Sequence, residues 1–195
     1  MKKLSLLDII CSGAMGLFGV LAFCLSFGAK LNMSYMGQTG YYSTIIWGCK
    51  SLNEGGVTHQ ISEMGLGFDK IQPAVLPMIG LILILLGVIA AVLVLLLVKK
   101  PWAKWVVLAC AVVIVAGGVF QFFAYTSFLR AYANTVAKAY GITDKENIKQ
   151  FYDATKEQLD KYNPKATMSI LCGVFGIVAG LAAGVVPFLP QKTAK

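Results

Sequence analysis

The sequence predicts an all-α integral membrane protein, and three observations carry this prediction: the composition, four long apolar segments and the placement of the lysines. Of the 195 residues, 57% are hydrophobic and only 13% are charged, whereas soluble domains carry about 25% charged residues. The mean hydropathy is +0.72. A water-soluble fold is therefore disfavoured. We expect one membrane domain over residues 1–195, a four-transmembrane-helix bundle with no separate enzyme domain.

Four apolar segments are long enough to cross the hydrocarbon core of a bilayer. A core about 30 Å thick takes about 20 apolar residues in a helix, because lipid offers no hydrogen-bond partner to a bare backbone. The predicted spans cover residues 6–29, 73–98, 102–125 and 166–189. Their central stretches contain no Asp, Glu, Lys, Arg or His, which disfavours a proton-coupled transporter or a voltage sensor.

The first span begins with a helix-start signal. Ser5 and Asp8 have the spacing of a capping box, which gives Asp8 a structural role. A cleaved signal peptide is the competing interpretation, because Lys2 and Lys3 precede the apolar core. That core is longer than the roughly 7 to 15 apolar residues of a signal peptide, so we retain the segment as a span.

Seven lysines in the short segments predict the orientation. They are Lys2, Lys3, Lys99, Lys100, Lys104, Lys192 and Lys195. Lysines of short loops collect on the cytoplasmic side, whereas the long loops 30–72 and 126–165 mix acids with bases. We therefore expect both termini in the cytoplasm and both long loops outside, in a bacterial cytoplasmic membrane or a eukaryotic plasma membrane. The net charge of +8 does not indicate that the protein binds nucleic acid, because no stretch of the sequence contains a cluster of five or six basic residues.

The second long loop is expected to fold as a helical hairpin. Apolar residues recur every three or four positions after residue 125, which predicts that the third span continues as a helix until Gly141 ends it. Thr143 and Glu146 have the spacing of a second capping box that restarts a helix. The less polar face of this helix is expected to bury itself against the first long loop; the face comprises Ile148, Phe151, Tyr152, Thr155 and Leu159.

The first long loop is rich in aromatic and β-branched residues between glycines, which predicts a short β-hairpin or small sheet. The aromatic runs are 33–35 and 41–47, and the glycines are Gly37, Gly40, Gly48, Gly55 and Gly56. Residues 61–68 are expected to form a further turn before the second span. Together the two long loops predict an ordered extracytoplasmic cap.

The residue pattern does not indicate catalysis. His59 is the single histidine and has no second ligand at a metal-binding spacing, so a packed or surface histidine is favoured over a metal ligand or base. Cys49 is the one cysteine outside the apolar segments, and a free packed thiol is favoured over a disulfide between chains. Asn32-Met33-Ser34 matches the acceptor pattern for N-glycosylation. This pattern occurs often by chance, so a chance match is favoured over glycosylation of Asn32. We expect no catalytic residue, no cofactor and no metal site.

Small residues in the fourth span predict close helix packing, since backbones approach closely where side chains are small. The stripe is formed by Gly173, Gly176, Gly180 and Gly184, and its expected complement in the first span by Gly13, Gly16 and Gly19. Packing within the bundle is favoured over a docking groove for another chain. Gln121 is expected to hydrogen-bond across helices, and Trp47 is expected to anchor the chain at the membrane interface.

Four spans, inner termini, a tight inner turn and a large aromatic first loop give an outline similar to that of claudin-like proteins. Claudin-type first loops carry a tryptophan-rich motif followed by a pair of cysteines, whereas Trp47-Gly48-Cys49 has no second cysteine after it in this loop. The Cys-Cys-Gly element of tetraspanins is absent from the sequence. We therefore assign no family and transfer no functional residues.

The expected function is that of a non-enzymatic accessory or assembly subunit of a membrane complex, acting through protein-protein interaction. The expected partners are the lipid bilayer and either another membrane protein or further copies of this chain, with no nucleic acid. The alternative is an oligomeric channel or a small-solute transporter subunit. A lipid-handling membrane enzyme is a third hypothesis.

Overall fold

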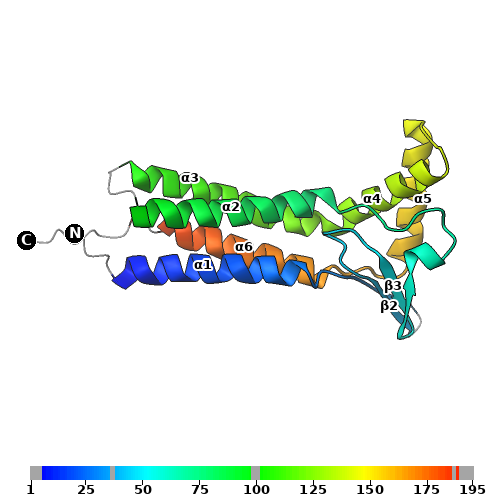
Figure 1. Cartoon of the computed structure of the whole chain (residues 1–195), viewed down its shortest axis with the longest axis horizontal. Coiled ribbons are helices and arrows are strands. Elements are labelled where there is room, and N and C mark those ends of the chain that lie inside the picture. The colour runs from blue at the N-terminus through cyan, green and yellow to red at the C-terminus, as the bar shows by residue number, and fades with distance from the viewer. Residues whose placement is uncertain (1–5, 36–37, 98–101, 186–187, 189–195) are drawn as a thin grey trace, which may run out of the picture. The chain divides into compact units, whose positions relative to one another are not determined.

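The computed structural model describes residues 6–35, 38–97, 102–185 and 188. The helices in this part of the chain are α1 (Leu6–Ser26), α2 (Val75–Leu97), α3 (Ala103–Phe120), α4 (Ala124–Ala139), α5 (Lys145–Asp160) and α6 (Thr167–Val185), with short 3₁₀ helices η1 (Ile61–Glu63) and η2 (Gln121–Phe123). The strands are β1 (Leu31–Tyr35), β2 (Gln38–Tyr42), β3 (Ser51–Glu54) and β4 (Val57–Gln60). They form one antiparallel sheet in the order β1-β2-β3-β4, so the small sheet expected in the first long loop is confirmed (Figure 1).

Within the described residues, four helical stretches are long and apolar enough to cross a membrane, which confirms the predicted number of spans. They are Ile9–Ser26, Val75–Leu95, Ala103–Ala139 and Thr167–Val185. The third stretch has 37 residues because α3, η2 and α4 follow one another directly. Ser5, and every lysine that predicted the orientation except Lys104, lie outside the described residues.

The chain forms two compact units. The four-helix unit comprises Met1–Cys24, Ile79–Gln121 and Leu171–Lys195, and the loop unit comprises Leu25–Met78 and Phe122–Ile170. Most of α1, α2, α3 and α6 therefore belongs to the four-helix unit. The sheet, α4 and α5 belong to the loop unit.

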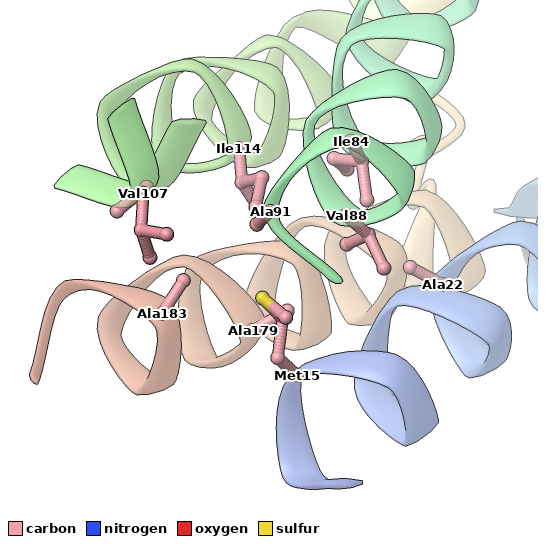
Figure 2. Packing of buried hydrophobic residues seen from close by; sticks show 10 residues of the cluster. Met15, Ala22, Ile84, Val88, Ala91, Val107, Ile114, Ala179 and Ala183 are labelled. Atoms are coloured by element: carbon pink, nitrogen blue, oxygen red, sulfur yellow. The ribbon is translucent and has the colours of Figure 1, made fainter. Parts of the chain in front are cut away.

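The core of the four-helix unit is built from small and medium-sized apolar side chains. Met15 of α1, Val88 of α2, Ile114 of α3 and Ala179 of α6 all belong to it (Figure 2). Other core alanines, which let the helices lie close together, are Ala22, Ala91, Ala111 and Ala183. Side chains that face outward are apolar as well; Leu181 of α6 is 61% exposed. Such a surface suits lipid rather than water.

The link between α4 and α5 is a well-formed helix C-terminus. Gly141 has φ +69°, a left-handed conformation that glycine adopts without a Cβ penalty. Its N–H donates to the carbonyl of Lys138, and the N–H of Ile142 donates to the carbonyl of Ala137 at 2.8 Å. These two bonds make a Schellman motif, so the prediction that Gly141 ends this helix is confirmed.

The start of α5 lies one residue later than predicted. Asp144, rather than Thr143, is the N-cap, and its Oδ1 accepts a hydrogen bond from the N–H of Glu146 at 3.2 Å. Thr and Asp are both good N-cap residues. The capping-box spacing therefore pointed to the right turn of the chain but to the wrong residue within it.

The first long connection contains two hairpins, β1-β2 and β3-β4, and the aromatic run 41–47 is strand only in its first two residues. Strand β2 ends at Tyr42, and the next residues turn back so that Ile45 and Ile46 are fully buried. Strands β3 and β4 were not predicted. They are joined by Gly55 and Gly56, whose φ angles of +58° and +86° are typical of a type I′ turn.

Backbone and hydroxyl hydrogen bonds tie the two long connections together. The N–H of Asn32 donates to the carbonyl of Lys165 at 2.9 Å, and the N–H of Lys165 donates back at 2.8 Å. The hydroxyl of Thr135 on α4 accepts from the N–H of Gln72 at 3.2 Å. The first connection is therefore held directly against α4 and against the residues that follow α5.

Candidate functional site

The loop unit contains a groove with a volume of about 810 Å³. One side is the face of the sheet, and the other is formed by α4, α5 and the residues just after α5. The groove is lined by Met33, Thr39, Gly40, Tyr42, Leu52, Asn53, Glu54, Tyr132, Phe151, Thr155, Gln158, Leu159, Lys161 and Tyr162. Its volume lies in the range of about 300–1,000 Å³ that is usual for ligand-binding pockets.

The strand register explains the sheet side of the groove. Met33 pairs with Gly40, and Gly40 pairs with Glu54. Directly paired residues point to the same face of a sheet, so this row lies under the groove. A Cβ on Gly40 would lie 2.8 Å from the carbonyl oxygen of Asn53. The position therefore requires glycine, and the sheet face is bare between Met33 and Glu54.

Aromatic rings from β2, α4 and α5 line the groove. Tyr42 of β2 packs on Phe128 of α4 with ring centroids 5.1 Å apart, and Tyr132 stacks on Phe151 of α5 at 6.3 Å. Phe128 is fully buried and packs against both Tyr42 and Tyr132, which holds these two rings in place. Burial raises the pKa of the Tyr42 hydroxyl above its ordinary range. The hydroxyl of Tyr42 therefore stays protonated at physiological pH and can donate a hydrogen bond.

The apolar face of α5 is less covered than predicted. We expected it to bury itself against the first long connection, but no described residue of α5 is buried. Phe151, Thr155 and Leu159 are only half-buried, because they line the groove. The prediction was right about the neighbour of this face and wrong about its closure.

A polar contact holds the end of α5 to the start of α4. The Tyr125 hydroxyl donates to Oδ1 of Asp160 at 2.5 Å, and Nζ of Lys156 lies 2.6 Å from Oδ2. Lys156, and then Tyr125, hold the pKa of the Asp160 carboxyl below its ordinary value. Asp160 therefore stays ionised near neutral pH, and the side of the groove formed by α5 is fixed relative to α4.

The glycines of α6 pack within the chain against α2 and α3. A Cβ on Gly176 would lie 2.6 Å from Cδ1 of Ile84, and a Cβ on Gly180 would lie 2.6 Å from Cγ2 of Val115. Gly173 supplies the carbonyl oxygen that a Cβ on Gly118 would meet at 2.8 Å. Gly184 has more room, since the nearest atom is a methyl carbon at 3.6 Å.

The glycines of α1 do not form the expected complement. A Cβ on Gly13 or Gly16 would meet nothing within 4 Å, and one on Gly19 would meet Val88 of α2 at 2.7 Å. The first and fourth spans do touch, as expected, but through the stacked rings of Phe18 and Phe175, whose centroids lie 5.8 Å apart. The contact between these two helices is therefore made by aromatic rings and not by the glycines of α1.

Gln121 and Trp47 are both held in defined positions. Gln121 is fully buried, and its Nε2 lies 2.9 Å from the position that a Cβ on Gly80 would take. Trp47 is 37% exposed; its ring stacks on Phe27 at 5.5 Å, and its Nε1–H donates to Oγ of Ser26 at 3.1 Å. A half-exposed indole with its N–H satisfied suits the interface role expected from the sequence.

His59 and Cys49 differ in their exposure to solvent. His59 is exposed on β4 and pairs with Leu52, so it shares the face of the sheet that forms the groove. The Cys49 sulfur lies 3.2 Å from the carbonyl oxygen of Ser51 and is fully buried, and this burial raises the pKa of the thiol to about 11. Among the described residues, no group of three His, Cys, Asp or Glu side chains could hold a metal ion.

No protein-family model matches the chain, and no curated protein matches it at a significant level. The groove was not predicted as a site. The signal for it was the amphipathic pattern of residues 148–159 opposite an aromatic loop.

Proposed function

We propose that this protein is a non-enzymatic, multi-pass membrane protein that acts through protein-protein interaction, as an accessory or assembly subunit of a membrane complex. The observation that carries the proposal is the groove in the loop unit, whose volume is about 810 Å³. Gly173, Gly176 and Gly180 of α6 pack against α2 and α3 of the same chain, so we assign the interaction surface to the groove rather than to this glycine stripe.

The side chains of the groove are typical of protein recognition. Tyrosine, phenylalanine and methionine are enriched at protein interfaces, and the lining contains Tyr42, Tyr132, Tyr162, Phe151 and Met33. Amide and hydroxyl groups between these rings supply adaptable hydrogen bonds, as they do in antibody combining sites. The groove therefore fits a protein partner better than it fits a reacting small molecule.

We further propose that the four apolar helices lie in the cell membrane, with both termini in the cytoplasm and the loop unit outside. The lysine distribution supports this orientation, because basic residues of short loops stay on the cytoplasmic side. An outside position makes the groove available to other proteins of the same membrane or to further copies of this chain. The alternative function, an oligomeric channel or transporter subunit, gains no specific support from the packed core around Gln121.

Native mass measurement after mild detergent extraction tests the proposal. The expected result is a defined complex, either with a second membrane protein or with further copies of the chain. A strictly monomeric species in every detergent, together with solute flux when the purified protein is placed in liposomes, would overturn it. The purified wild-type protein is expected to show no single-turnover chemistry with lipid substrates. Turnover that is lost in His59→Ala or Cys49→Ala would indicate a lipid-handling enzyme instead.

A further inference from the structure

The groove leaves the apolar face of α5 partly uncovered by the chain itself. An amphipathic helix normally turns its apolar stripe toward a core, yet α5 has no buried residue. Phe151, Thr155 and Leu159 recur at four-residue steps and therefore lie along one line of the helix. All three side chains line the groove, so an occupant would contact α5 at several successive points.

The residues that line the groove include both apolar rings and polar side chains. Tyr132 and Phe151 offer stacked ring surface, while Thr155 and Gln158 of α5 offer a hydroxyl and an amide group. An acyl chain would leave those polar groups without hydrogen bonds, which is unfavourable. A polypeptide segment supplies both kinds of contact, because its side chains alternate with backbone N–H and C=O groups.

The charged side chains of the groove further limit which molecules could bind there. Among the described lining residues, the charged side chains are Glu54 on the sheet side and Lys161 after α5. They have opposite signs and both are exposed. A groove with one acid and one base does not attract a polyanion such as nucleic acid. It complements a segment that carries one basic and one acidic side chain, and such rim charges set specificity more than affinity.

We infer that the groove binds an extended polypeptide segment of a partner protein, with apolar side chains along α5, a basic side chain beside Glu54 and an acidic side chain beside Lys161. This inference rests on the proposed function, since it names the partner surface that the interaction would use. The segment covers the line formed by Phe151, Thr155 and Leu159 and completes the burial of α5.

The test uses a phage-displayed library of linear peptides, selected on the full-length protein in lipid nanodiscs. Thr155→Trp fills the groove, whereas Ala154→Trp places the same ring on the exposed neighbouring position of α5 and is the matched control. We expect selected peptides to bind Thr155→Trp about tenfold more weakly or worse, and to bind Ala154→Trp as they bind the wild type. Equal binding to both variants would overturn the inference while leaving the proposed function intact.

Charge reversal tests the arrangement of the occupant without filling the groove. Glu54 is exposed at the end of β3, so Glu54→Lys is expected to fold normally. Peptides selected on the wild type should carry a basic residue, and a new selection on Glu54→Lys should enrich an acidic residue at the same place. An unchanged peptide pattern, or binding of glycans in place of peptides on an array, would overturn the inference. Native mass measurement would then decide separately whether any protein partner exists.

Discussion

Single glycines set how closely α2, α3 and α6 approach one another. A Cβ on Gly80 would lie 2.5 Å from the carbonyl oxygen of Gly117, and a Cβ on Gly118 would lie 2.8 Å from that of Gly173. Backbone atoms at such contacts cannot give way without moving a helix. The four-residue spacing in α6 predicted a close-packed face. Spacing alone does not tell which helix lies against that face, so α1 was chosen as its complement in error.

Gly80→Ala is expected to destabilise the chain by about 1–3 kcal/mol, because the added methyl group overpacks the contact with α3. The free energy of unfolding, measured by denaturant titration in mixed micelles, checks this expectation. Gly16→Ala is the matched control. A Cβ on Gly16 meets nothing within 4 Å, so this change should be neutral or stabilise the helix by about 0.5–1 kcal/mol. Similar losses for both variants would contradict the observed packing.

Cys49 predicts a pH dependence of stability in the alkaline range. Burial raises the pKa of its thiol from 9.0 to about 11, so the folded chain holds this proton more tightly than the unfolded chain does. The stabilisation is complete below pH 9.0 and is lost as the pH rises toward about 11. The loss reaches about 2–3 kcal/mol.

Comparison with Cys49→Ala isolates this effect from the other groups that titrate at high pH. The difference in free energy of unfolding between the wild type and Cys49→Ala should shrink steadily above pH 9.0. A difference that stays constant through this range would show that the thiol is not buried. The same burial predicts that a maleimide labels His59→Cys, which is exposed, much faster than it labels Cys49.

The sequence pattern predicted the helices better than the strands. Long apolar runs define α2 and α6 because helices in lipid need continuous hydrophobicity. Strands β3 and β4 read Ser-Leu-Asn-Glu and Val-Thr-His-Gln, and neither shows the alternation that marks a half-buried strand. Their pairing depends on the Gly55-Gly56 turn and on contacts with β2, which lie outside any local window.

Asp144→Ala is expected to destabilise the loop unit by about 0.5–2 kcal/mol, the usual loss for an N-cap. Thr143→Ala tests the residue that the sequence favoured, and it should change stability little. Hydrogen exchange of the α5 amides measures both variants locally, and faster exchange is expected only for Asp144→Ala. Faster exchange in Thr143→Ala alone would indicate that Thr143, the predicted residue, is the N-cap of α5.

The groove lay beyond sequence prediction for a related reason. The amphipathic pattern of α5 and the aromatic residues of the first long connection both indicated burial, and each faces the other in the loop unit. Whether two such faces close depends on the bulk between them. Gly40 removes a side chain from the sheet side, and the contact of Tyr125 with Asp160 fixes the end of α5. Neither effect is visible in hydrophobic periodicity.

The whole chain can form this fold in a membrane in one arrangement, with both long connections on the same side. Four helical stretches can cross it, and an even number of crossings returns each terminus to the same side. Both long connections contribute to one loop unit, joined by the hydrogen bonds between Asn32 and Lys165. The two connections must therefore lie on the same side of the membrane, because the groove, which residues of both connections line, exists only if they do.

Cysteine labelling in intact cells tests this arrangement most directly. In a background in which Cys11, Cys24, Cys49, Cys110 and Cys172 are replaced by alanine, single cysteines are placed at His59, Ala154 and Lys104. A membrane-impermeant maleimide should label His59→Cys and Ala154→Cys from outside, and Lys104→Cys only after the membrane is opened. Labelling of His59→Cys and Ala154→Cys from opposite sides, or of all three from outside, would contradict the account.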